Sequence, residues 1–177
     1  MQHGTPYRGQ RLRGWWMSEK LDGCRAFWDG AAMWSRGGTP IRLPAALHSA
    51  LPAGIALDGE IYGGPGTLDA AREAVVHGRF SRGLRFMIFD APSAVGAWPA
   101  RLRSAASALG PAKCVGVVAA WLCEGERHAA RILGEVHARG GEGLMLRAPG
   151  LAYAPGRTRD LVKLKRPYYA TFLGARV

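Results

Sequence analysis

Lysine is scarce in this chain of 177 residues. Only 4 of its 24 basic residues are lysine and the other 20 are arginine. A guanidinium is effectively never deprotonated, whereas a lysine amine can lose its proton and then act as a nucleophile. Three of the four lysines lie in two short segments, Glu19–Gly23 and Leu161–Lys165. We therefore ask first whether Lys20 carries out covalent chemistry.

Acidic residues are also few, because 13 Asp and Glu face 24 Lys and Arg. The formal net charge is +11 and the sequence pI is about 10.4. So large a positive charge on a small chain favours a polyanionic partner, although a basic but inert surface is the alternative. No segment has the pattern of a basic amphipathic anchor, so a membrane surface is not the expected partner.

Cysteine gives no metal or disulfide framework. Cys24, Cys114 and Cys123 contain no CxxC pair, which excludes the usual zinc spacing and favours a reducing compartment. The first fourteen residues have no apolar core typical of a signal peptide. We expect a cytoplasmic protein. A periplasmic protein whose signal peptide had been removed would show the same N-terminal sequence features. No run approaches the ~20 apolar residues of a membrane span.

The remaining composition is that of a folded protein, with 48% hydrophobic and 21% charged residues. The length suits one substantial core. Hydrophobic patterns and turn residues predict strands over 15–28, 31–36, 55–62, 84–90, 115–122, 143–147 and 161–165, and helices over 67–77, 98–109 and 124–139. Strands and helices do not alternate regularly, and short turns join several neighbouring strands. This arrangement favours an α+β fold with antiparallel sheets.

Two segments in the N-terminal half carry charged residues within or beside predicted strands. Lys20-Leu21-Asp22-Gly23 places a candidate nucleophile before a turn, although a polar strand end would look similar. Asp58 and Glu60 are two residues apart and should share one face of a strand. Neighbouring carboxylates repel unless a cation lies near them. The alternative for Asp58 and Glu60 is a solvated strand edge.

Three later segments offer further polar or aromatic groups. Phe89 closes an apolar strand and could stack on a base, or could be a plain core aromatic. Glu142 stands between glycines at a strand entrance, where it suits a divalent ion or is simply a loop acid. Lys163 and Lys165 are two residues apart on one strand face, which suits a polyphosphate or a solvated basic edge.

The order of these segments resembles the covalent nucleotidyltransferase superfamily, which comprises ATP-dependent DNA ligases, RNA ligases and mRNA capping enzymes. The resemblance runs from about residue 15 to residue 166. It is carried by Lys20–Arg25 (K-x-D-G-x-R), Ser35–Gly38, Asp58–Glu60, the Phe89 segment, Glu142-Gly143 and Lys163–Lys165. Within the superfamily, Ser18–Gly23, Ser35–Gly38 and Leu57–Gly64 look most like the small bacterial ATP-dependent DNA ligases. Pro65 departs from their pattern, which tends to have a basic residue there.

The resemblance implies a fold of two antiparallel β-sheets flanked by helices, the ATP-grasp-like adenylation fold of ligases. We expect an adenylation domain over residues 1–170 and the start of a linker over 171–177. The OB-fold domain that normally follows in the family is not seen. Either the sequence is truncated, or it is a natural single-domain form that lacks the OB-fold domain or borrows it from a separately supplied domain or partner. We expect the chain alone to seal nicks poorly.

The resemblance also implies three phosphoryl transfers. Lys20 would attack the α-phosphorus of ATP to give lysyl-AMP, AMP would pass to a 5′-phosphate at a nick in double-stranded DNA, and the 3′-hydroxyl would then displace AMP. Nucleotide contacts are implied for Ser18, Glu19, Arg25, Arg36, Glu60, Phe89, Lys163 and Lys165, and Mg²⁺ binding for Glu60 and Glu142. Asp22 would orient the motif loop.

Other functions remain open from the sequence. An RNA ligase is the nearest enzymatic alternative, and a capping-type nucleotidyltransferase is a weaker one because no guanine-selective feature is evident. A basic DNA-binding module without catalysis belongs to a different class. An NAD-dependent ligase is disfavoured because no extra nicotinamide-binding domain precedes the lysine motif. We expect a monomer with ATP and nicked DNA as partners and no membrane association.

Overall fold

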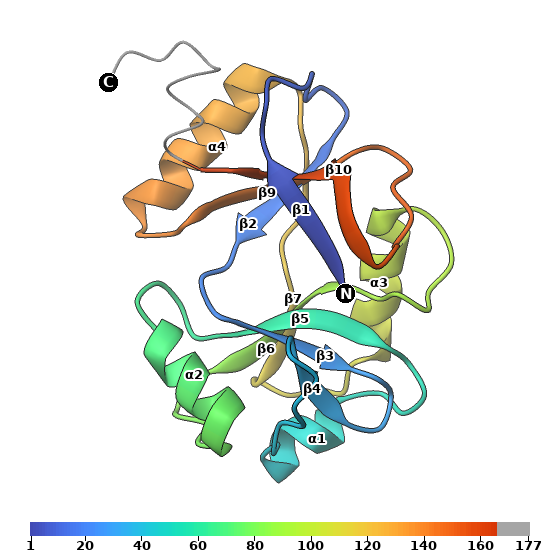
Figure 1. The fold of residues 1–177 in the computed structure, drawn as a ribbon, viewed down its shortest axis with the longest axis vertical. Coiled ribbons are helices and arrows are strands. Elements are labelled where there is room, and N and C mark those ends of the chain that lie inside the picture. The colour runs from blue at the N-terminus through green and yellow to red at the C-terminus, as the bar shows by residue number, and fades with distance from the viewer. Residues whose placement is uncertain (166–177) are drawn as a thin grey trace. The chain divides into compact units, whose positions relative to one another are not determined.

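A computed structural model describes residues 1–165, and these divide into two compact units. The central unit comprises residues 22–118 together with Met1. The terminal unit comprises residues 2–21 and the described residues from 119 onward. Each unit is built on its own five-stranded sheet with at least one helix beside it (Figure 1).

The sheet of the central unit has the strand order β4-β3-β5-β6-β7. Its strands are β3 (Cys24–Trp28), β4 (Met33–Ser35), β5 (Leu57–Tyr62), β6 (Arg85–Asp90) and β7 (Val115–Val117). The helices of this unit are α1 (Ala45–Ala50), α2 (Leu68–His77) and α3 (Trp98–Ala108). Helix α2 contacts β3 and β5, and α3 contacts β6 and β7. The helices therefore cover the sheet on its apolar side.

Alternation along the strands separates an apolar face from a polar one in the central unit. The apolar face supplies buried core residues from three strands, namely Ala26, Trp28, Leu57, Ile61, Phe86 and Ile88. The strand register pairs Arg25 with Glu60, and Glu60 with Met87, on the opposite face. Since successive side chains point to opposite sides of a strand, burial of the apolar set turns the charged set away from the core.

The sheet of the terminal unit has the order β1-β10-β9-β2-β8. Its strands are β1 (Gln2–Pro6), β2 (Trp16–Lys20), β8 (Trp121–Leu122), β9 (Gly143–Arg147) and β10 (Gly156–Leu164), and its helix is α4 (Glu126–Ala138). Helix α4 buries Ala129, Ile132, Leu133 and Val136 and contacts β9. These side chains recur at the spacing of an amphipathic helix. The core they form also contains residues of β2, β9 and β10.

The α+β prediction and its two sheets flanked by helices are confirmed. The sheets are not wholly antiparallel, however, because β1 pairs with β10 and β6 pairs with β7 in parallel. The predicted strand over 15–28 is divided into β2 and β3 by residues 21–23. Strand β1 and helix α1 were not predicted, since each is a short segment whose partners lie far away in the sequence. The predicted linker over 171–177, and the end of the predicted domain at 170, lie outside the described residues.

None of the helices within residues 1–165 has the length and apolar character needed to cross a lipid bilayer.

Candidate active site

Lys20 lies at the end of β2, where its register partner on β9 is Gly143. Its Nζ forms an ion pair with Oε2 of Glu142, and Nζ of Lys165 forms another with Oε1 of the same carboxylate. Glu142 directly precedes β9, and Lys165 directly follows β10. The ends of three strands thus bring two lysines and one glutamate together, although the sequence separates Lys20 and Glu142 by 122 positions.

The two ammonium groups dominate the charge of this cluster. Burial acts to raise the pKa of Glu142, but hydrogen bonds from Lys165 and Lys20 outweigh it, and the pKa lies below its ordinary value. Glu142 is therefore a carboxylate near neutral pH. Two ammonium groups around one carboxylate leave a net positive charge, which suits an entering phosphate.

The lowered pKa of Glu142 predicts an acid-sensitive contribution to stability. The unfolded chain binds this proton more readily, so the contribution is complete above the unfolded pKa of ~4.3 and is lost as pH falls through the lower folded pKa. We expect Glu142→Gln to lower the melting temperature at pH 7, with the difference from the unaltered chain shrinking toward pH 3. Thermal unfolding across this pH range measures the effect. A difference that grows on acidification would contradict it.

Strand register explains which other predicted residues join Lys20. Ser18 pairs with Met145, and Met145 pairs with Lys163, so these residues and Lys20 lie on one face of the terminal sheet. Glu19 alternates to the other face, where Oε2 lies 3.7 Å from Nη2 of Arg139, the residue that follows α4. The structure therefore brings Ser18 and Lys163 to the face of Lys20 and directs Glu19 away from it.

Ser18 is buried, and its hydroxyl accepts a hydrogen bond of 2.9 Å from Nη1 of the buried Arg147. This bond joins β2 to β9 two residues before the candidate nucleophile. Sequence reasoning missed Arg147, since nothing near it in the chain indicates a partner 129 positions away. The expected nucleotide contacts of Ser18 and Glu19 stay predictions.

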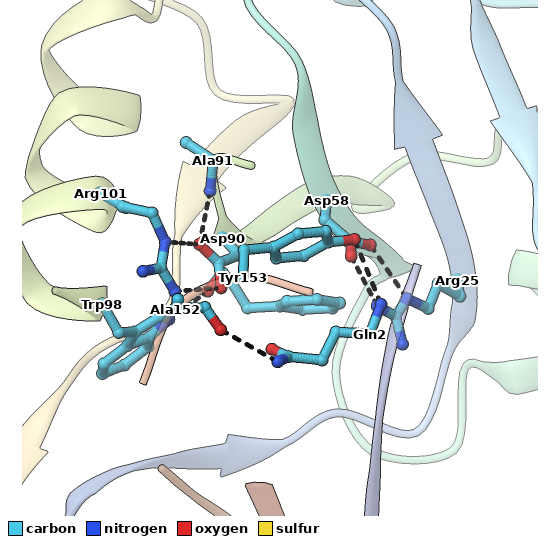
Figure 2. A network of polar contacts seen from close by, with 10 residues as sticks. Gln2, Arg25, Asp58, Asp90, Ala91, Trp98, Arg101, Ala152 and Tyr153 are labelled. Carbon is cyan, nitrogen blue, oxygen red and sulfur yellow. Dashed lines mark hydrogen bonds and ion pairs between the residues drawn. The ribbon is translucent and has the colours of Figure 1, made fainter. Parts of the chain in front are cut away.

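In the central unit, Arg25 links two of the sequence motifs. Its Nε and Nη2 donate to the two carboxylate oxygens of Asp58 at 2.9 and 2.5 Å (Figure 2). Its Cζ lies 5.0 Å from the centroid of the Phe89 ring. Two-pronged pairing fixes the guanidinium plane, and an Arg over an aromatic face is mutually favourable. Arg25 is therefore the cation that pairs with Asp58, one of the two neighbouring carboxylates on β5.

Glu60 and Arg36 occupy less enclosed places in the central unit. Glu60 is half-buried on β5 opposite Arg25 in the register. Arg36 is exposed in the turn after β4, where the amide of Thr39 donates to Oγ of Ser35 at 3.1 Å. The structure thus gathers Arg25, Glu60 and Phe89 on neighbouring strands and holds Arg36 on the tip of a turn.

Two motifs contain a glycine at a position where a side chain would not fit. A Cβ on Gly23 would lie 2.2 Å from the carbonyl oxygen of Ile61, and one on Gly59 would lie 2.5 Å from Cε2 of Phe86. Atoms repel strongly at these distances, and a close-packed interior leaves no free volume into which the neighbours could move. The glycines in Lys20–Gly23 and Asp58–Glu60 therefore permit the close packing of β5 against its neighbours.

We predict that Gly59→Ala destabilises the chain by ~1–3 kcal/mol, since the added methyl overpacks a filled core. Equilibrium unfolding in urea measures the change. Gly37→Ala is the matched control, because its Cβ would meet only Oγ of Ser35, at 3.9 Å. An equal effect of both substitutions would refute the steric explanation.

The expected Mg²⁺ ligands differ in how well they suit a metal. No cluster of three or more His, Cys, Asp or Glu side chains with metal-binding geometry occurs among residues 1–165. Mg²⁺ bound with a nucleotide usually needs only one or two carboxylates, with phosphates and water as the other ligands. The half-buried carboxylate of Glu60 fits that role. Glu142 does not fit while Lys20 and Lys165 are paired with both of its oxygens.

No family model matches the sequence, but individual known proteins are similar to it. The DNA ligase of Haemophilus influenzae is 29% identical over 163 residues, which cover 90% of this chain and 60% of that protein. A solved structure from a study of DNA binding with a minimal scaffold in Lig E DNA ligases is 30% identical. It has a TM-score of 0.82 over 93% of this chain and 68% of its own.

The Chlorella virus DNA ligase-adenylate is 20% identical, with a TM-score of 0.75 over 93% of this chain and 66% of its own, and shows the same fold. The chain spans 60% of the curated relative and about two thirds of these solved structures. Similarity over that extent, together with the shared fold, leads to one assignment. The chain belongs to the family of ATP-dependent DNA ligases, and its described residues have the fold of their adenylation domain.

Proposed function

We propose that this chain is the catalytic domain of an ATP-dependent DNA ligase that forms a covalent lysyl-AMP on Lys20 and passes the AMP to a 5′-phosphate at a DNA nick. The observation that carries the proposal is the cluster of Lys20, Lys165 and Glu142 at one end of the terminal sheet. In this cluster a candidate nucleophile, Lys20, and a second cation, Lys165, each form an ion pair with the carboxylate of Glu142.

In the first step, Nζ of Lys20 forms a bond to the α-phosphorus, the bond from that phosphorus to the bridging oxygen breaks, and pyrophosphate leaves. The amine must be unprotonated to attack and must leave its ion pair with Glu142. Entering phosphates compete with Glu142 for both ammonium groups. Lys163 and Lys165 then offset the charge that grows on the phosphate oxygens.

The central unit supplies the groups suited to the rest of the nucleotide. The half-buried ring of Phe89 offers a face for adenine, and Arg25 holds the ring in place from one side. The exposed Arg36 suits a phosphate or ribose contact. Glu60 is the proposed protein ligand of Mg²⁺, which would offset the charge of the triphosphate when bound.

Nicked duplex DNA is the proposed partner, because a net charge of +11 favours a polyanion. We further propose that the protein acts as a monomer in the cytoplasm. Assays of AMP transfer to the 5′-phosphate of matched nicked DNA and nicked RNA, which do not depend on efficient sealing, distinguish a DNA ligase from an RNA ligase. Preference for the RNA nick would overturn the assignment of DNA as substrate.

The test of adenylation is the intact mass of the protein after incubation with ATP and Mg²⁺. We expect one added AMP per chain, and no addition when the ATP is left out. Addition from GTP but not from ATP would favour a capping-type enzyme. Salt-dependent DNA binding without any added mass would favour a binding module.

A further inference from the structure

Strand β6 carries a β-bulge at Phe89. Asp58 of β5 is paired with Asp90, whereas the next residue, Gly59, is paired with Ile88, so Phe89 has no register partner on β5. The parallel pairing with β7 ends at Ile88, whose carbonyl accepts from the amide of Val118 at 2.9 Å. Bulges interrupt the ladder and re-aim a side chain. Phe89 is therefore the residue at which the register between β5 and β6 shifts.

Helix α3 contacts the backbone at the bulge through a side chain. Nε1 of Trp98, the first residue of α3, donates to the carbonyl oxygen of Phe89 at 2.6 Å. Trp98 is only 1% exposed, so its indole cannot turn toward solvent without opening the core. A buried carbonyl without a partner is unfavourable, and the bond from Trp98 removes that cost for the bulged residue itself.

The residue after the bulge is fixed by the same helix. Arg101 of α3 donates to both oxygens of Asp90, from Nε at 2.7 Å and from Nη2 at 3.0 Å. Oδ1 of Asp90 also accepts from the amide of Ala91 at 2.9 Å, and Nη1 of Arg101 donates to the carbonyl of Gly96 at 2.9 Å. Both side chains of the pair are nearly fully buried. A two-pronged charged pair in such a place allows little change in position.

We propose that Trp98 and Arg101 are positioning residues for the nucleotide base, because they hold the bulged Phe89 with its ring facing Arg25. The inference rests on the proposed function, in which that ring stacks on adenine. Because Trp98 and Arg101 are only 1% and 2% exposed, we place neither in contact with the nucleotide. They act through the backbone on either side of Phe89, and their loss should weaken recognition of the base while leaving recognition of the phosphates unchanged.

The test uses substitutions that remove hydrogen bonds near Phe89 but keep a side chain of similar kind. Trp98→Phe removes the indole donor. Arg101→Lys keeps the positive charge but cannot form the two-pronged pair with Asp90. Trp28→Phe is the matched control, because Trp28 is also buried and its Nε1 donates to the carbonyl of Pro52 at 2.7 Å, away from Phe89. Arg103→Lys is the control on the exposed face of α3.

The measured quantities are the dissociation constants of ATP and of inorganic tripolyphosphate, by titration calorimetry at one salt concentration. Stacking of a base on an aromatic ring changes affinity by roughly tenfold. We expect Trp98→Phe and Arg101→Lys to weaken ATP binding about tenfold and to leave tripolyphosphate binding unchanged. Trp28→Phe should lower the melting temperature to a similar extent as Trp98→Phe without changing either dissociation constant.

A second comparison separates positioning from general destabilisation. In a Phe89→Leu background, Trp98→Phe should not weaken ATP binding further, since the ring it positions is gone. Equal weakening for ATP and tripolyphosphate, additive effects in that background, or unchanged ATP affinity in both variants would overturn the inference.

The same samples keep this inference distinct from the proposed function. If the unaltered chain binds ATP but gains no AMP, the proposed catalysis fails while the binding comparison still decides the role of Trp98 and Arg101. If the unaltered chain binds no ATP, both proposals are overturned.

Discussion

Replacing Lys20 by arginine is expected to abolish formation of the covalent adenylate. Arginine keeps the positive charge and can still pair with Glu142, but its guanidinium is not deprotonated and does not act as the nucleophile. Loss of a nucleophile that no other group replaces should reduce the rate by at least about a thousandfold, or ~4 kcal/mol in activation free energy. Labelling with ATP radioactive at the α-phosphate, followed by denaturing electrophoresis, measures this rate.

Lys113→Arg is the matched control for Lys20→Arg. Lys113 is the one lysine outside the proposed site motifs, so its replacement should leave labelling unchanged. Tripolyphosphate should still bind to Lys20→Arg, because the charge of the cluster is preserved. A label that persists in Lys20→Arg would show that another residue accepts the AMP.

Asp90→Ala is expected to cause the largest loss of stability in the central unit. The substitution leaves the guanidinium of Arg101, which is 2% exposed, without its carboxylate partner. An uncompensated buried charge of this kind costs ~3–5 kcal/mol. The free energy of unfolding in urea, measured for the unaltered and altered chains, tests this prediction.

Asp69→Ala provides the control for Asp90→Ala. Asp69 pairs with Arg72 on helix α2 at 2.9 Å, but both side chains are largely exposed. Exposed pairs of this kind contribute about 0–1 kcal/mol. If Asp90→Ala were no more destabilising than Asp69→Ala, the pair with Arg101 would not hold the end of β6 in place.

Several features of the site could be predicted because they depend on spacing along one strand. Asp58 and Glu60 were expected on one strand and in need of a nearby cation, and Arg25 now supplies that cation to Asp58. Lys163 and Lys165 were expected on one strand face. Val162 and Leu164 between and beside them are buried core residues, as that alternation requires.

Other features could not be predicted from spacing. Glu142 was expected to hold a metal, yet in the structure its two oxygens contact Lys20 and Lys165. Glu19 was grouped with Lys20, but alternation along β2 turns it toward Arg139. The bulge at Phe89 and its hydrogen bond from Trp98 have no signature in the local sequence. Each depends on a partner from another element.

By itself, the sequence determined the types of groups available, which are a rare lysine, paired charges two residues apart and an aromatic residue at the end of a strand. These follow from the period of a strand and the chemistry of each side chain. The tertiary structure decided which groups meet. Lys20 meets Glu142 across 122 positions because β2, β9 and β10 pair in one register. Strand pairing of that range is set by burial of the apolar faces, which no short segment encodes.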